Sequence, residues 1–119
     1  MPQRPQETLR QLCAIFPAFE AAWAEEGAPP EDGLVDGVYY EWSHHAILSD
    51  FLEFFAKNHA SFSEQQLGAV GEWINDAVFD GGDLENAVST CFLEHTRGIR
   101  INRTLQPYLS PEAKRRQRP

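Results

Sequence analysis

The fold of this 119-residue chain is decided by one stretch, Leu84-Glu85-Asn86-Ala87-Val88-Ser89-Thr90-Cys91-Phe92-Leu93-Glu94-His95. Six of its positions follow the i, i+3, i+4, i+7 spacing of a single helix face: Leu84, Ala87, Val88, Cys91, Phe92 and His95. The opposite side carries small, mildly polar residues, namely Asn86, Ser89 and Thr90. We therefore expect a mostly enclosed helix, with His95 as a hydrogen-bonded core histidine.

The residues flanking this stretch set its ends. Gly81-Gly82 precedes it, Asp83 is placed as an N-cap, and Gly98 is a C-terminal stop. The sequence thus predicts a buried helix over 84–97 at the centre of the molecule. Around it we expect an all-α fold, a single compact domain of about four to six helices, because a chain of this length forms one core.

Three earlier segments have helical patterns. The first covers 6–26 and is interrupted by Pro17, so we expect either a kink or two short helices, the second beginning at Pro17. The second runs from an N-cap at Ser43 to about His59 with a wide apolar stripe. In the third, Ser63 and Gln66 match a capping box, and the buried face is Leu67, Val70, Gly71, Ile74, Ala77 and Val78, ended by Gly81-Gly82.

The remaining segments are less regular. Residues 27–37 hold three Gly and two Pro and are predicted to be a loop. Residues 38–42 have strand composition but no second clear strand to pair with, so they are interpreted as extended or as an early helical turn. A short helix is expected after Gly98, and Ser110-Pro111-Glu112 begins a last turn. We divide the chain into a helical domain, 1–110, and a short basic, solvated tail, 111–119.

Charge divides the chain into two unequal parts. Between Glu7 and Glu94 there are seventeen acidic residues against two basic ones, whereas from His95 to Pro119 seven basic residues face one Glu. An acidic body repels nucleic acid and anionic membranes and attracts cationic partners. No apolar run reaches the roughly 18–20 residues that span a bilayer, and the first five residues lack the apolar stretch of a secretory signal. We expect a cytoplasmic protein.

No cofactor, metal or catalytic motif is present in the sequence. Cys13 and Cys91 both fall on apolar helix faces and are predicted to be reduced core residues. His44 and His45 are sequence neighbours at a helix start, so their side chains point about 100° apart and do not share one ion. We expect no catalytic residue, no cofactor and no metal ligand.

Three carboxylates, those of Glu72, Asp76 and Asp80, lie four residues apart and form one row on the predicted third helix. Like charges at this spacing each cost about 0.2–0.5 kcal/mol. Several interpretations stay open. The row is a solvated face or one neutralised by Arg97, Arg100 and Arg103, or it is a docking surface for a basic partner continued by Asp83 and Glu85, with a metal site as the remaining alternative.

A family resemblance adds to this pattern. The segments Phe16-Pro17-x-Phe19 with Trp23, the Phe54-Phe55 helix and the stretch 86–95 resemble those of small, all-helical bacterial proteins that are met as immunity proteins beside polymorphic or contact-dependent toxins. The resemblance covers about residues 7–110 and implies a helical fold without catalytic residues. It also implies a cognate toxin domain as the partner.

The function predicted from charge and resemblance is an immunity protein, not an enzyme, that neutralises a basic toxin domain through Glu72, Asp76, Asp80, Asp83 and Glu85. It would bind neither nucleic acid nor membrane directly. Three alternatives are a general helical adaptor, a small enzyme with a pocket near His44, His45 and Tyr39 or Tyr40, and a nucleic-acid mimic. The apolar residues Trp23, Tyr39, Tyr40 and Trp42 would serve equally as a homodimer surface or as the edge of the core.

Overall fold

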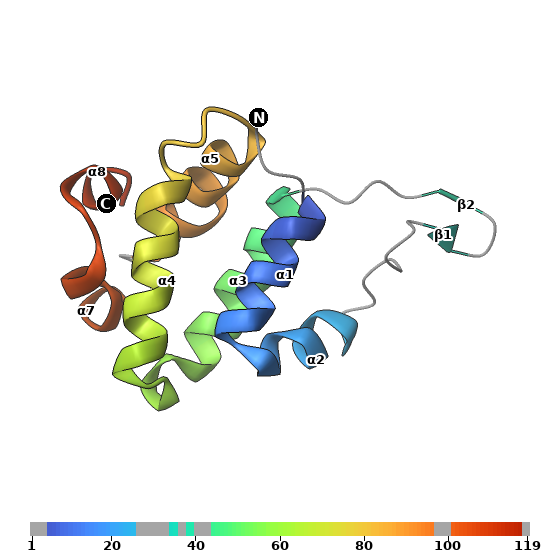
Figure 1. Cartoon of the computed structure of the whole chain (residues 1–119), viewed down its shortest axis with the longest axis horizontal. Helices are drawn as coiled ribbons and strands as arrows, with labels where there is room; N and C mark the ends of the chain where they lie inside the picture. The colour runs from blue at the N-terminus through green and yellow to red at the C-terminus, as the bar shows by residue number, and fades with distance from the viewer. Residues whose placement is uncertain (1–4, 26–33, 36–37, 40–43, 97–100, 118–119) are drawn as a thin grey trace.

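The computed structural model describes residues 5–25, 34–35, 38–39, 44–96 and 101–117 (Figure 1). Its helices are α1 (Pro5–Ile15), α2 (Pro17–Glu25), α3 (His44–Asn58), α4 (Glu64–Ala77), α5 (Asp83–Ala87), α6 (Glu94–Thr96), α7 (Asn102–Leu105) and α8 (Pro111–Arg115). Short 3-10 turns follow α3 and α7, at His59–Ser61 and Gln106–Tyr108. A π-helical turn, Val88–Leu93, joins α5 to α6, and the three form one continuous helix over 83–96.

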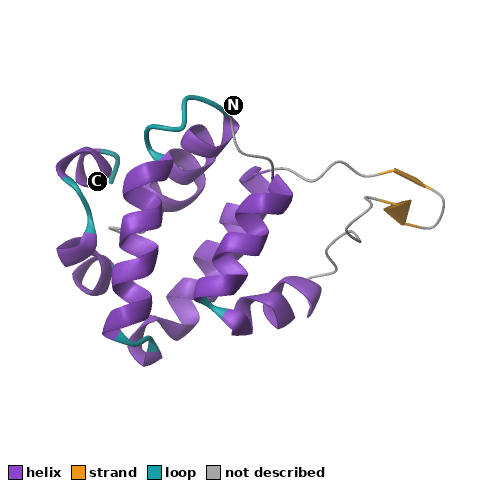
Figure 2. Cartoon of the chain, viewed as in Figure 1, coloured by secondary structure: helices purple, strands orange, loops and turns teal. Residues whose placement is uncertain are grey.

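The all-α fold is confirmed, and helix dominates the described residues in Figure 2. Counting 83–96 as one helix, these residues form seven helical segments, one more than the four to six expected, because the basic end adds α8. The helices surround a single cluster of buried side chains, as expected for one domain. Among the described helices, none has both the length and the apolar character needed to cross a bilayer.

Two short strands interrupt the helical pattern. Strands β1 (Leu34–Val35) and β2 (Val38–Tyr39) pair antiparallel, with Leu34 opposite Tyr39. The expectation that residues 38–42 lack a partner strand was therefore wrong for Val38–Tyr39. The partner was missed because two residues of strand inside a Gly- and Pro-rich segment give no alternation to detect. Residues 40–42 lie outside the described residues.

The first helical segment divides at Pro17, which confirms the second of the two interpretations. Helix α1 ends at Ile15 and α2 begins with Pro17 at its first position, where the missing backbone N–H has no helical partner to lose. Leu12, Phe16 and Phe19 are buried on either side of this break. Trp23 is also buried, at 8% exposure, so it belongs to the core edge and not to an open patch.

Helix α3 supplies the aromatic centre of the core. Phe51 is fully buried and packs against rings of α2, its own helix and the π turn. Its ring centroid lies 5.2 Å from that of Phe19 and 5.4 Å from that of Phe92, the second at an interplanar angle of 25°. Phe55 contacts Phe92 edge-on at 5.7 Å. These offset and edge-on arrangements are the favourable ones for aromatic pairs.

The 83–96 helix has its predicted core face only over its first half. Leu84, Ala87 and Val88 are buried as expected, but beyond them the buried positions are Phe92, Leu93 and Thr96. Phe92 belongs to the predicted face, whereas Leu93 and Thr96 are buried in place of Cys91 and His95. A π turn spans five residues per hydrogen bond and takes in one extra residue, so the face rotates by about 100°.

Three predictions about this helix were wrong, the first of them because of this rotation. His95 is exposed, and Thr96 takes its place in the core, where its hydroxyl donates to the Leu93 carbonyl at 2.8 Å. The helix is also less enclosed than expected, since Asn86 and Thr90 are exposed. Asp83 is the first helical residue and not the N-cap, which is Gly82. The proposed stop at Gly98 lies outside the described residues.

Helix α4 begins as predicted. The Ser63 hydroxyl accepts from the Gln66 backbone N–H, and the Gln66 side chain accepts from the Ser63 N–H, which completes the capping box. The predicted face of α4 is buried throughout. The helix ends at Ala77, earlier than expected. After it, the backbone N–H groups of Phe79 and Asp80 form i→i+3 hydrogen bonds, and Gly81 follows with a positive φ of +80°, which ends the helical path.

The α4 helix packs between α1 on one side and the C-terminal segments on the other (Figure 1). Trp73 donates its indole N–H to Gln11 of α1 at 2.8 Å. On the other side the Asn75 amide donates to the Tyr108 carbonyl and accepts from the Ser110 N–H at 2.7 Å. Between these two attachments, α4 leaves one face free.

The basic end is not a solvated tail over its described part, 111–117. Ser110 caps α8 by accepting from the Ala113 N–H, and Ala113 is fully buried. Gln117 is buried too and donates to the Thr96 hydroxyl at 2.8 Å. The expected boundary at 110 between the helical domain and the basic tail therefore falls within packed structure. Ala113 and Gln117, which lie beside or between basic residues, are both buried.

Gly71 and Gly68 give a matched test of the packing between α4 and the C-terminal segment. A Cβ at Gly71 would lie 2.5 Å from the Cβ of Tyr108 and 2.7 Å from its carbonyl oxygen, whereas one at Gly68 would meet nothing within 4 Å. We expect Gly71→Ala to lower the free energy of unfolding by about 1–3 kcal/mol through overpacking. Gly68→Ala should raise it by about 0.5–1 kcal/mol through helix propensity. Urea denaturation measures both, and equal effects would contradict the close approach.

Candidate functional site

The predicted row of carboxylates is divided by the end of α4. Glu72 and Asp76 are exposed on the helix, whereas Asp80 lies beyond it and is half-buried. One carboxylate oxygen of Asp80 is shielded from solvent and has no hydrogen-bond donor among the described residues. The row therefore presents two full carboxylates and part of a third, not three equivalent ones.

These carboxylates have no cationic partner in the described part of the chain. None of Glu72, Asp76 and Asp80 forms an ion pair there. Arg103 is exposed and forms none with them, and Arg97 and Arg100 lie outside the described residues. Within the described structure, the negative charge on this face is left uncompensated.

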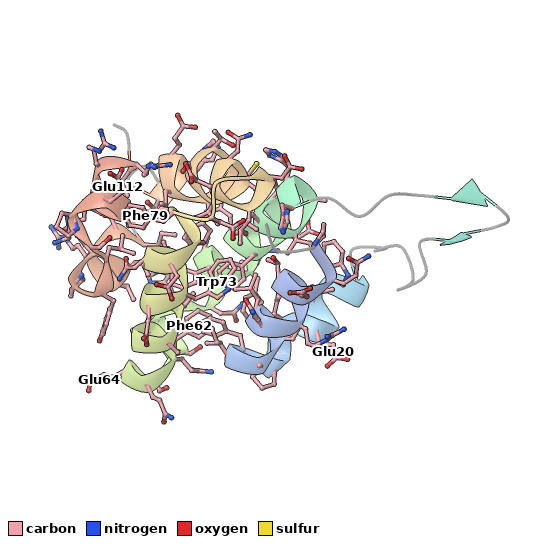
Figure 3. The ribbon with its side chains drawn as sticks, turned by 45° about the horizontal axis from the view of Figure 1, so that its top comes forward. Glu20, Phe62, Glu64, Trp73, Phe79 and Glu112 are labelled. Atoms are coloured by element: carbon pink, nitrogen blue, oxygen red, sulfur yellow. The ribbon has the colours of Figure 1, made fainter. Side chains whose placement is uncertain are left out.

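An exposed aromatic residue follows the two helical carboxylates. Phe79 is 69% exposed, and it is the large hydrophobic residue that the described structure leaves on the surface. It lies at the end of α4 opposite to Glu64 (Figure 3). Its backbone N–H bonds to the Asp76 carbonyl, so it follows Asp76 by one tight turn. Phe79 was not among the predicted site residues. The sequence nevertheless indicates its exposure, because Phe79 falls outside the apolar spacing of the buried face of α4.

The last two predicted residues differ from each other. Asp83 is exposed at the start of α5, just past the Gly81-Gly82 turn. Glu85 is half-buried and already engaged: its carboxylate accepts from the Gly81 N–H at 3.0 Å and pairs with Arg116 at 3.3 Å. Glu85 thus belongs to an internal network and is the weakest member of the predicted docking surface.

Arg116 is the centre of that internal network. Its guanidinium reaches the Glu112 carboxylate at 2.9 Å, the Ser89 hydroxyl at 2.9 Å and the Val78 carbonyl at 3.3 Å, in addition to Glu85. Hydrogen bonding to Glu112 raises the pKa of Arg116. The planar guanidinium donates in several directions at once, which ties α8 to the 83–96 helix and to the end of α4.

A half-open groove of about 680 Å³ runs beside this network. One wall is the outward side of the 83–96 helix, with Asn86, Ser89 and Thr90, and the other is α8, with Arg115 and Arg116. A second hollow of about 330 Å³ lies between α2 and α3. The groove is polar and holds both charge signs, so its chemistry does not select one ligand class.

The histidines do not form the pocket suggested by the enzyme hypothesis. His44 is buried, with Nε2 2.9 Å from the Thr8 hydroxyl, whereas Nδ1 of His45 lies 3.1 Å from Sγ of Cys91. The two rings turn to different partners, as their adjacent positions on a helix predicted. The side chain of Tyr39, and Tyr40 altogether, lie outside the described part of the chain.

The two cysteines are free thiols that pack against the core, but both are only half-buried, so the prediction that they are core residues is confirmed only in part. Cys91 lies at the edge of the core because the π turn rotates the buried face to Phe92 and Leu93. Its contact with His45 joins residues 46 positions apart, which no local pattern indicates. Among the described residues, no group of three or more His, Cys, Asp and Glu is arranged to hold a metal ion.

Comparisons of the chain with protein-family models, with curated proteins and with solved structures gave no match. The functional argument therefore rests on the geometry and charge of the molecule, together with the resemblance given by its sequence.

The Glu112 carboxylate gives a pH-dependent test of how α8 is attached. Hydrogen bonds from Arg115 and then Arg116 lower its pKa below the ordinary value. A lowered folded-state pKa contributes stability that is present above the unfolded pKa, about 4.3, and is lost as the pH falls through the folded one. We expect the urea midpoint of the wild type to fall more steeply between about pH 5 and pH 3 than that of Glu112→Gln. Glu20→Gln serves as the control and should keep the wild-type slope.

Proposed function

We propose that this protein is a binding module whose α4 acidic face receives a basic protein partner. This face is defined as Glu72 and Asp76 on α4, Phe79 just beyond its end and Asp83 at the start of α5. Asp80 lies at the edge of this face. The observation that carries the proposal is the exposed Phe79, 69% accessible, among carboxylates without an ion-pair partner in the described structure. The proposed role is binding and not catalysis.

Electrostatics supports a cationic partner. Glu72 and Asp76 are four residues apart on one helix, so their repulsion costs about 0.2–0.5 kcal/mol in the free chain. Asp76 also lies in the last turn of α4, where the helix dipole disfavours negative charge. A partner that brings Lys or Arg to this face would relieve both costs. Complementary charge of this kind mainly raises the association rate and the selectivity.

Phe79 supports a protein as the partner over a small cation. Aromatic side chains at the middle of an interface contribute much of its binding energy when they are desolvated in a pocket of the partner. Phe79 has carboxylates before it, at Asp76, and after it, at Asp80 and Asp83. An apolar centre bordered by charge is the usual arrangement of a protein–protein interface.

The resemblance to immunity proteins suggests which basic protein this is. Toxins that cut nucleic acid are commonly basic, so an acidic protein can be steered to them and cover the active site. We therefore propose a cognate toxin domain as the partner and neutralisation as the role, acting in the cytoplasm. The acidic body argues against direct binding to nucleic acid or to an anionic membrane.

Charge reversal on α4 tests the proposal. The product of the neighbouring gene, which the proposal expects to be the toxin domain, is titrated with wild type, with Glu72→Lys/Asp76→Lys, and with a control, Glu20→Lys/Glu53→Lys. Both variants change the net charge equally, but the control alters α2 and α3. We expect the α4 variant to lose at least about tenfold in affinity, or 1.4 kcal/mol, and to lose protection of cells, while the control stays within about threefold.

Three other outcomes are informative. Equal losses in both variants would mean that net charge and not the α4 acidic face governs binding. Unchanged affinity and protection in the α4 variant would refute the surface assignment. If the neighbouring gene product does not bind but another basic protein does, and the α4 variant loses it, the adaptor alternative replaces the immunity role.

A further inference from the structure

Cys91 lies in a cluster of side chains that the binding role does not use. The Nδ1 atom of His45 is 3.1 Å from the Cys91 sulfur, and the Asn86 amide is 3.4 Å from the Nε2 atom of the same ring. The Thr90 hydroxyl is 3.8 Å from the sulfur and donates to the Asn86 carbonyl at 2.8 Å. The cluster thus combines a thiol, an imidazole on the thiol and an amide on the far side of the imidazole.

This order of groups is suited to activating a nucleophile. A nucleophile and a base within hydrogen-bond reach, with a third group orienting the base, is the general arrangement of activated Ser and Cys residues. The Asn86 amide presents either its nitrogen or its oxygen by a half-turn of the side chain. With the oxygen toward Nε2, Asn86 accepts the Nε2–H and leaves Nδ1 to take the thiol proton. Asn86 is then a positioning residue.

Three elements hold the cluster in place. His45 is in the first turn of α3, Asn86 is in α5 and Cys91 is in the π turn. The π turn moves Cys91 out of the core, where a regular helix would have placed it, and toward the start of α3. Packing of Phe51 and Phe55 on Phe92, the residue next to Cys91, fixes α3 against this turn.

The cluster borders the half-open groove. Asn86 and Thr90 are exposed and line that groove, and both contact the cluster. Cys91 and His45 do not line the groove, but both are half-buried, so each side chain keeps some exposure to solvent next to Asn86 and Thr90.

The second cysteine provides a contrast within the same chain. Burial, and then the neighbouring Glu20 carboxylate, raise the pKa of the Cys13 thiol. Both effects disfavour the thiolate, which is the nucleophilic form. Cys13 therefore serves as an internal reference for an unactivated thiol.

We propose that Cys91 is a thiol-modification site that reacts with small disulfides, with His45 as the proton acceptor and Asn86 as the residue that orients it. As the sulfur attacks one sulfur of the disulfide, the thiol proton passes to Nδ1 of His45. A new S–S bond forms at Cys91 and the old S–S bond breaks. The released thiolate takes the proton from the imidazolium, so that Cys91 is oxidised, half of the disulfide is reduced to a thiol, and a mixed disulfide remains beside the groove.

The test uses the full chain and glutathione disulfide as the probe, with each cysteine followed by mass spectrometry of its peptide. At pH 7 we expect Cys91 to react at least about tenfold faster than Cys13. His45→Gln should slow Cys91 by at least about threefold at pH 7, where an ordinary thiol is only about 3% ionised. At pH 9.5 solvent alone removes the thiol proton, so the difference should fall below about twofold.

Two controls separate chemistry from folding. An unchanged rate at Cys13 in the His45→Gln variant shows that the fold is intact, and Asn86→Ala, at an exposed position, should give a smaller loss with the same pH dependence. Equal wild-type rates at Cys91 and Cys13 would overturn the proposal. The proposal would also be overturned if His45→Gln left the reaction rates of both Cys91 and Cys13 unchanged at pH 7. A decrease in the Cys91 rate of equal size at pH 7 and pH 9.5 would overturn it too, because such a decrease would reflect access to the sulfur and not proton transfer.

Discussion

The packing of Phe92 against Phe51 and Phe55 is the contact on which the rest of the structure depends. It joins α3 to the π turn, with ring centroids 5.4 Å and 5.7 Å apart. A regular helix would bury Cys91 beside Phe92 and place His95 in the core. The wide turn instead buries Leu93 and Thr96 and rotates Cys91 toward His45. One extra residue in one turn thus determines both the core and the thiol cluster.

Helix α4 depends on the same core from the other side. Its buried face packs on α1 and on the C-terminal segment. At the C-terminal segment, Gly71 allows the backbone of Tyr108 to approach, and the Asn75 side chain forms hydrogen bonds with the Tyr108 carbonyl and the Ser110 N–H. Both attachments leave Glu72 and Asp76 on the free face. The early end of the helix then exposes Phe79. The α4 part of the proposed docking surface is therefore the face of the helix that neither α1 nor the C-terminal segment covers.

Local chemistry explains which features were predictable from the sequence. The break at Pro17, the capping box of Ser63 and Gln66 and the buried face of α4 depend on residues within one or two turns, and all three were confirmed. The exposed acidic residues on α4 were predictable in the same way, as the complement of its apolar spacing.

Features that depend on contacts between distant residues were not predictable. The phase change in the 83–96 helix depends on packing against α3, so no local spacing indicates it. Arg116 pairs with Glu85, 31 positions away, and thereby turns an expected solvated tail into packed structure. The cluster at Cys91 combines both causes, because the phase change leaves the thiol half-buried at the core edge and α3 supplies the imidazole.

The most direct test of this account is a double-mutant cycle on Phe51 and Phe92. Phe51→Leu, Phe92→Leu and the double variant keep apolar bulk at both positions, and urea unfolding gives the free energy for each. Direct ring contact predicts a coupling energy of about 0.5–1.5 kcal/mol, so that the double variant loses less stability than the two single losses combined. Losses that add to within about 0.3 kcal/mol would show that the rings do not interact, and the packing of α3 on the π turn would then be wrong.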